Sequence, residues 1–423
     1  MKRALSALGL VVAGAAAVGQ PAPELEPAQF LASPPMEGPA EYAGFKASIG
    51  VEIFDRRRPV PDAPDTALRS VLDFRKEWRV GDQLRLALSN RLESLEVNTG
   101  HGTVRNALRE AYLSASVGDS AFVDVGRINL RSGVGLGFNP SDWLREGASL
   151  PQTTQNPASQ RENRLGTFML KMQAVQGWGA AHVALIPHLV RRPDEESAHG
   201  LDLGRTNADP ALHLRIAPKV NERISVDLLA YARSGRQPQW GLNTTAVMSD
   251  ALIAHFEWSA GLREGLVDPS QQRSRSLHHR VATGFSWTAP NGAVLAMERH
   301  LATDALSRDD WNTWRLSTAN AIAVRLGQLR GERLALQDPL VRDAWFFRVA
   351  MNGLLRDPDI DVSAFLRLNP HDNSRLWQLD GSWHANAQLS LHISAGGFSG
   401  GSRSEFGANA LRSFVALRGE VAF

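Results

Sequence analysis

The chain has 423 residues with a formal net charge of +2, and 43% of its residues are hydrophobic. A net charge this close to zero creates no overall field that would indicate nucleic acid as a partner. The chain contains no cysteine, which excludes disulfides, thiolate metal sites and a lipid anchor on an acceptor cysteine.

The N-terminal residues carry the features of an export signal. Lys2 and Arg3 precede an apolar run, Ala4–Val18, that ends in small residues. A helix needs ~20 apolar residues to span a bilayer, so the run fits a secretory signal peptide better than the alternative, an uncleaved anchor. We expect residues 1–19 to be a signal peptide and residues 20–41, rich in Pro and Ala, to be a periplasmic lead-in. Residues 42–423 are then the folded part.

Hydrophobic side chains alternate with polar ones as soon as the lead-in ends. Ile49, Val51 and Ile53 share one parity, whereas Lys46 and Glu52 have the other. Side chains on a strand point to opposite faces with period two, so this stretch is predicted to be a strand with one apolar face. The pattern recurs along the chain and predicts about eighteen strands, or sixteen if the weak stretch Trp240–Met248 is not one.

The connections between these stretches indicate the architecture. Short turns such as 118–120 and 177–179 alternate strictly with longer polar connections. Outer-membrane barrels have short periplasmic turns and long external loops, whereas a soluble sandwich or propeller would not segregate them. The predicted fold is therefore all-β: a transmembrane, antiparallel, up-and-down β-barrel. The long connections are 55–65, 93–104, 131–164, 191–210, 234–239, 261–278, 302–344, 369–374 and 399–409.

The last stretch, Leu411–Phe423, alternates most clearly. Val415 and Leu417 lie on its apolar face, and Arg418 lies on the other. A terminal Phe after such a strand resembles the C-terminal signature of bacterial outer-membrane barrels, which the barrel-assembly machinery reads. We expect Phe423 to serve as that assembly signal; the last strand of a soluble sheet is the alternative.

Three segments together resemble a known family. They are REAYLSASVGDSAFVDVGRINLRSGVGLGFNPSDWLR at 109–145, HVALIPHLVRRP at 182–193 and AMERHL at 296–301. Their order is similar to that of outer-membrane porin-like barrels of the alginate-export type in Gram-negative bacteria. The resemblance implies a channel that carries polar or charged solutes, or saccharides, and has no catalytic residues.

The charged residues of the inward parity are the predicted pore lining. Opposite charges on opposite walls would make a selectivity filter. The alternative is that these residues pair with one another and only make the lumen polar. Basic residues outnumber acidic ones, so we expect a preference for small polar, anionic solutes. The predicted pore-lining residues are Lys46, Glu52, Arg85, Arg91, Glu110, Asp227, Arg233, Arg280, Glu298, Arg348, Arg367, Arg412, Arg418 and Glu420.

Two loops are long enough to fold inward. In 131–164, Asn139 starts a predicted turn, Asp142 is placed to cap a short helix, and Arg145 follows; these three are the predicted constriction residues. In 302–344, Thr318–Gln328 has the pattern of a helix. A surface position is the alternative for both loops.

Two other function classes are compatible with such a barrel. A barrel enzyme of the lipase or protease type needs a nucleophile or activated water beside a histidine. Ser390 and His392 share a parity, as do His255 and Glu257, but such spacing is common and no motif surrounds them. We therefore expect no enzyme activity, no cofactor and no metal. A plugged structural or adhesion barrel is the other alternative.

The expected partners follow from the barrel prediction. They are outer-membrane lipid, the barrel-assembly machinery and a small polar or anionic solute, with no nucleic acid. The sequence carries no signal of the oligomeric state.

Overall fold

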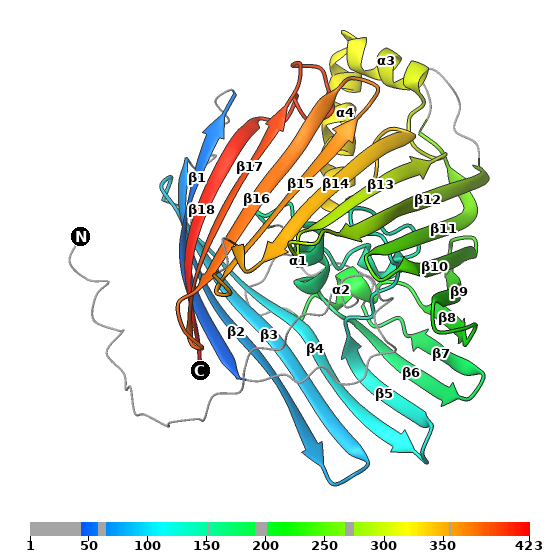
Figure 1. Cartoon of the computed structure of the whole chain (residues 1–423). Helices are drawn as coiled ribbons and strands as arrows, with labels where there is room; N and C mark the ends of the chain where they lie inside the picture. Colours follow the sequence, from blue (N-terminus) through cyan, green and yellow to red (C-terminus); the bar gives the residue numbers. More distant parts are fainter. Residues whose placement is uncertain are drawn as a thin grey trace.

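Eighteen strands form one closed antiparallel sheet in the computed structural model of the chain (Figure 1). The structure describes residues 44–57, 65–100, 102–150, 152–190, 201–266, 275–354 and 357–423. The predicted signal peptide, 1–19, and the lead-in, 20–41, lie outside these residues. Among the described residues, no helix is long and apolar enough to span a membrane.

The strands follow one another around the wall in chain order. They are β1 Phe45–Arg56, β2 Thr66–Val80, β3 Leu84–Val97, β4 Thr103–Val117, β5 Ala121–Ile128, β6 Thr167–Gln176, β7 Gly179–Ile186, β8 Ala211–Pro218, β9 Ile224–Arg233, β10 Gln239–Ser249, β11 Leu252–Glu264, β12 Arg275–Thr288, β13 Val294–Ala302, β14 Asp343–Asn352, β15 Ile360–Asn369, β16 Ser374–His384, β17 Leu389–Ser399 and β18 Leu411–Ala422. The helical segments lie in the loops: η2 Trp143–Arg145, α1 Pro157–Glu162, α2 Leu203–Thr206, α3 Arg308–Leu316 and α4 Asn320–Ala335.

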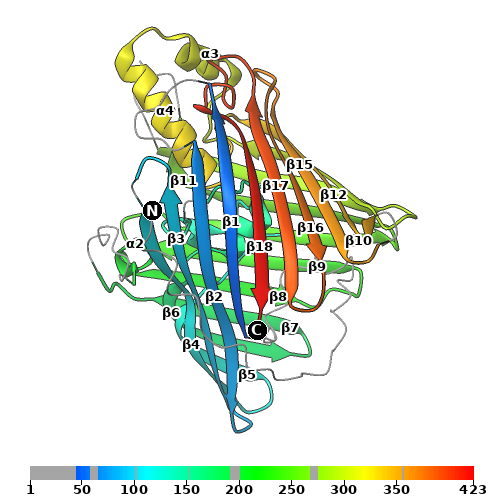
Figure 2. The ribbon, with the colours of Figure 1, turned by 90° about the vertical axis from the view of Figure 1, so that its left-hand side faces the viewer.

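The predicted fold class and the count of eighteen strands are confirmed. The weak stretch Trp240–Met248 forms strand β10, which pairs with both β9 and β11. The ring closes where β1 pairs antiparallel with β18, with Ser48 opposite Glu420 and Gly50 opposite Arg418 (Figure 2). Closure leaves no unpaired edge, which is how a barrel satisfies its backbone inside a bilayer.

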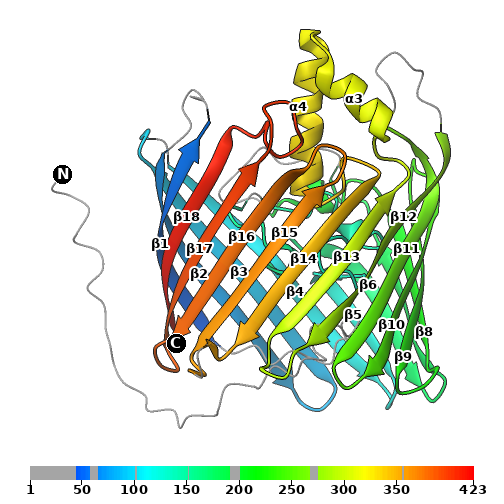
Figure 3. The same ribbon diagram turned by 45° about the horizontal axis from the view of Figure 1, so that its top comes forward.

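Turn length separates the two ends of the barrel (Figure 3). Gly81 and Gly118 sit in short turns with φ of +66° and +67°, a left-handed conformation that glycine adopts without strain. The opposite end carries the long connections, including α3 and α4. The buried Trp311, Leu326 and Leu340 pack these helices together above the wall.

The two faces of the sheet differ in chemistry. Large apolar side chains such as Ile49, Ile53 and Leu417 are exposed on the outer face. Exposed tryptophans, Trp178 and Trp383 among them, lie at or near strand ends, as in an interfacial girdle. The inner face carries polar and charged groups, so any functional site of a barrel interior must be built from that face and from the loops folded onto it.

Candidate functional site

The connection between β5 and β6, residues 129–166, folds into the barrel and includes α1 (Figure 1). Thr153 Oγ1 donates to Glu52 on β1 at 2.8 Å, and the Gln155 N–H donates to Gln378 on β16 at 2.7 Å. On another part of the wall, Ser141 Oγ lies 3.0 Å from the side-chain amide of Asn243 on β10. The loop therefore crosses the lumen and is tied to widely separated strands.

Glu257 of β11 is the main anchor of this loop. One carboxylate oxygen accepts the N–H groups of Val134, at 2.8 Å, and Gly135, at 3.0 Å. The other accepts the N–H and Oγ of Ser141, at 2.8 and 2.9 Å. Hydrogen bonds to an ionised acceptor are about twice as strong as neutral ones, so a single buried carboxylate holds both ends of a tight turn.

Glu298 of β13 holds the middle of the same turn. Its carboxylate accepts the N–H groups of Leu136, at 2.5 Å, and Gly137, at 2.8 Å, while His255 and His300 each lie 2.8 Å from it. A side chain at position 137 would collide with the ring of Phe346, so glycine allows the loop backbone to approach the wall.

Asp142 does not act as a helix cap, contrary to the sequence interpretation. It occupies the N-cap position of η2 but makes no side-chain capping hydrogen bond. Instead its carboxylate accepts Nη1 of Arg164 at 2.7 Å, and both side chains are buried. Burial alone would raise the pKa of Asp142, but Arg164 and Arg161 outweigh it and hold that pKa below its usual range. The buried carboxylate of Asp142 is therefore neutralised by an arginine, which the end of a short helix could not do.

The predicted constriction residues therefore separate into two groups. Asn139 and Asp142 are buried, and the amide of Asn139 donates to Gly135 O at 2.6 Å and to Glu257 at 3.2 Å. Arg145 lines a cavity and is paired with Asp338 from the connection between β13 and β14. Asn139 and Asp142 shape the loop; Asp142 also lines the cavity, but Arg145 is the more exposed of the two.

The strand register places the predicted pore-lining residues, except Arg412, on one face of the sheet, the face opposite the exposed apolar band. Arg412 lies at a register shift between β1 and β18 and has no paired residue on β1, so the register does not place it on the inner face. The acidic members of the set are the more sequestered. Glu52, Glu110, Asp227 and Glu298 are buried, with Glu52 bonded to Arg69 at 2.6 Å. Asp227 is paired with Arg215 at 2.9 Å.

Several basic members remain accessible to water. The side chains of Lys46 and Arg418 are 57% and 38% exposed, and both pair with Glu420. Arg412, 58% exposed, lies next to the long-loop rim and contacts Asp55. The remaining basic members, Arg85, Arg91, Arg233, Arg280, Arg348 and Arg367, are partly or largely shielded.

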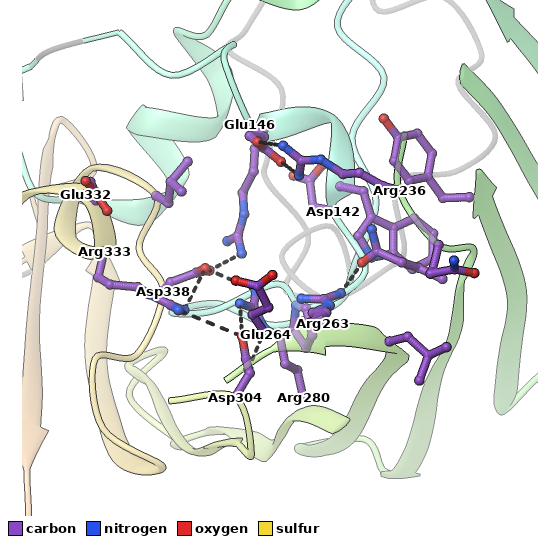
Figure 4. Close-up of a pocket in the computed structure, with 18 of the residues that line it drawn as sticks. Asp142, Glu146, Arg236, Arg263, Glu264, Arg280, Asp304, Glu332, Arg333 and Asp338 are labelled. Atoms are coloured by element: carbon purple, nitrogen blue, oxygen red, sulfur yellow. Dashed lines mark hydrogen bonds and ion pairs between the residues drawn. The ribbon is translucent and has the colours of Figure 1, made fainter. Parts of the chain in front are cut away.

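A cavity of about 550 Å³ lies beside the inward loop, between η2, β11, β12 and the β13–β14 connection (Figure 4). Arg280 contacts Asp304 and, at 3.0 Å, Asp338, and Arg333 also pairs with Asp338 at 3.3 Å. Arg263 donates to Gln239 instead of a carboxylate. The cavity thus presents interleaved charges of both signs on its walls.

Sequence reasoning did not single out several residues of this site. Alternation assigned a face to each strand residue, but it did not show that Glu257 anchors a loop or that Asp304 and Asp338 reach the cavity. Glycines at 133, 135 and 137 offered one signal, because glycine-rich turns expose successive N–H groups that suit a carboxylate.

The serine and histidine considered for an enzyme do not pair with each other. Ser390 Oγ lies 3.0 Å from Nδ1 of His384, whose Nε2 is 3.2 Å from Asp361, whereas His392 contacts Ser382 at 2.8 Å. Strand β17 pairs with both neighbours at Ser390, so the backbone N–H groups there serve the sheet.

Similar proteins are found by structure and not by sequence. No protein-family model matches the chain, and no curated protein matches it. Pseudomonas aeruginosa OccK11 (OpdR) superposes with a TM-score of 0.52 at 10% identity, over 90% of this chain and 96% of that one. OccK5 (OpdH) from the same organism gives 0.51 at 9%, over 91% and 99%. A mutant Rh. blastica porin gives 0.43 at 9% identity, over 90% and 99%.

The two Pseudomonas structures share the barrel fold with this chain. At identities of 10% and 9%, the likeness extends to the fold alone. The resemblance of three segments to alginate-export-type barrels stays a prediction.

Proposed function

We propose that this chain is an outer-membrane channel for small polar solutes, with a mild preference for anions. The observation that carries the proposal is a closed barrel with an apolar outer face, a charged inner face and one loop tied across the lumen. An apolar outer band suits lipid, and a polar interior with an inward loop suits a selective aqueous path.

The preference for anions rests on which charges reach water. Four of the five acidic residues in the inward set are buried, whereas Lys46 and Arg418 are substantially exposed. Fixed positive charge at a water-filled wall raises the local concentration of anions. Glu420 contacts both Lys46 and Arg418 and therefore weakens the effect, as does salt over a Debye length of ~8–10 Å.

The proposed location and partners follow from the same features of the barrel. A cysteine-free barrel with an apolar outer band would sit in the outer membrane of a Gram-negative bacterium and depend on the barrel-assembly machinery for insertion. The chemistry is passage of solute, without catalysis or a cofactor. Carboxylates and saccharides with acidic groups are the solute classes that exposed arginines suit best.

Planar-bilayer recording of the purified protein tests the proposal. Discrete current steps are expected, with a reversal potential across a salt gradient that favours anions at low salt. The same sample denatured by heat is the control for detergent artefacts. A folded barrel that gives no steps would favour a plugged structural or adhesion barrel, and a cation-selective current would contradict the anion preference.

A further inference from the structure

The outer face of the barrel carries an apolar groove on β12–β15. The groove has a volume of about 380 Å³, and its lining includes Phe285, Leu295, Met297, Phe347, Ala364 and Leu366. The register places these side chains in two adjacent rows: Phe285, Met297, Phe347 and Leu366 form one, and Leu295 and Ala364 belong to the next, on either side of Val349. Ala364 is the small residue of its row, so the surface is hollowed there.

A third row, nearer the long-loop end, carries positive charge. Arg299 is opposite Trp345, Trp345 is opposite Leu368, and Leu368 is opposite Arg375. Two exposed arginines therefore flank a tryptophan and a leucine on the outer face, three strand spacings apart, or roughly 14 Å. The row lies two residues, or ~7 Å along the strand, from the first row of the groove.

The two features are joined by direct contacts. The guanidinium of Arg299 lies 5.8 Å from the Trp345 ring centre, and Trp345 stacks on Phe347 at 6.2 Å. The carboxylate of Asp343 accepts hydrogen bonds from Nε and Nη2 of Arg299, at 3.1 and 3.0 Å. An arginine has five N–H donors, so three remain for another anion. Trp345 thus connects a charged rim to the apolar groove beneath it.

We propose that this surface binds a phosphorylated glycolipid of the outer leaflet, of the lipopolysaccharide type. Its phosphates would contact Arg299 and Arg375, and one acyl chain would lie in the groove. The inference rests on the proposed outer-membrane location, which puts the long-loop end at the outer leaflet. Arginine suits phosphate because its N–H groups match the phosphate oxygens, and tryptophan suits the interface between headgroup and chain.

A second copy of this chain fits the surface less well. In a symmetric dimer the same patch meets itself, so Arg299 and Arg375 of one copy would approach those of the other. Like charges brought together in a low-dielectric contact repel, whereas a phosphate neutralises them.

Native mass spectrometry of the full folded protein tests the site, with hexa-acylated diphosphoryl lipid A as the probe. Arg299→Gln with Arg375→Gln is expected to lower lipid A binding about tenfold, as the loss of two charge-assisted contacts predicts. Ala364→Phe fills the groove without changing charge and is expected to lower binding severalfold. Lys76→Glu is the matched control, because Lys76 is also an exposed outer-face cation beside a tryptophan, Trp78, but lies at the short-turn end.

Four results would overturn the inference. They are unchanged binding in the double arginine variant, an equal loss in Lys76→Glu, equal binding of phosphatidylglycerol, and a dimer that Ala364→Phe dissociates. Heat-modifiable mobility confirms that each variant is folded before binding is compared. Conductance recorded in bilayers without lipid A tests the channel proposal separately, so a silent barrel that still binds lipid A refutes that proposal alone.

Discussion

Replacing Glu257 with Gln should loosen the inward loop. The carboxylate accepts five hydrogen bonds, from the N–H groups of Val134, Gly135 and Ser141, from Ser141 Oγ and from the Asn139 amide. Glutamine keeps one oxygen and turns an NH₂ group toward the donors that faced the other. One or two buried backbone N–H groups then lose their acceptor, at about 1–3 kcal/mol each, so the loop is held less firmly by about 1–6 kcal/mol.

Single-channel recording measures the consequence. The variant is expected to show noisier open current and a higher mean conductance, because residues 134–141 spend more time away from the wall. Limited proteolysis should cut this segment faster than in the unchanged protein. Glu146→Gln is the control: it changes the same residue type in the same loop, but Glu146 is half-exposed on the cavity wall and its two bonds, both 2.6 Å, join it to the exposed side chain of Arg236. A folded Glu257→Gln protein with unchanged noise, conductance and cleavage would refute the reasoning.

Three further predictions concern selectivity, assembly and pH. Arg412→Glu with Arg418→Glu should shift the reversal potential toward cations, and most of the shift should come from Arg418, since Arg412 lies next to the rim; an unchanged potential would mean that neither residue faces the conducting path. Phe423→Asp should lower the amount of heat-modifiable barrel in the outer membrane, because it puts a charge on an exposed outer position beside the β1–β18 seam; normal levels would count against an assembly role. Burial raises the pKa of Glu405, in the β17–β18 loop, to about 7. Protonation therefore stabilises this loop fully below the unfolded pKa, and that stabilisation is lost as the pH rises through about 7. Hydrogen exchange in 400–410, corrected for its intrinsic pH dependence, should be slower at about pH 6 than at about pH 8, and Glu405→Gln should abolish the difference.

The wall of the barrel was predictable because its rule is local. Period-two alternation assigns each residue to a face from its immediate neighbours, and even the weak stretch at β10 followed it. The helix expected over 318–328 is α4, Asn320–Ala335. The sequence pattern did not predict its extension to 335, because the apolar and polar residues of α4 do not separate clearly into two faces.

The interior was less predictable because its contacts join distant parts of the chain. Glu257 accepts a hydrogen bond from Ser141, which lies 116 positions away in the sequence, and Arg145 pairs with Asp338, 193 positions away. Nothing in the spacing along one strand tells which loop will supply the donors. For the same reason, Asp142 looked like a local helix cap, whereas a buried Arg164 on the far side of the loop offers a stronger partner.

The central claim is that solute passes along the inner face of a closed barrel, and two neighbouring residues test it. The chain has no cysteine, so Arg418→Cys and Leu417→Cys each create the only thiol, one on the inner face and one on the outer. A negatively charged thiosulfonate reagent added during bilayer recording should change the current and the ion preference of the Arg418→Cys channel and leave Leu417→Cys unaffected. Modification that alters the Leu417→Cys current, or has no effect on Arg418→Cys, would contradict the account.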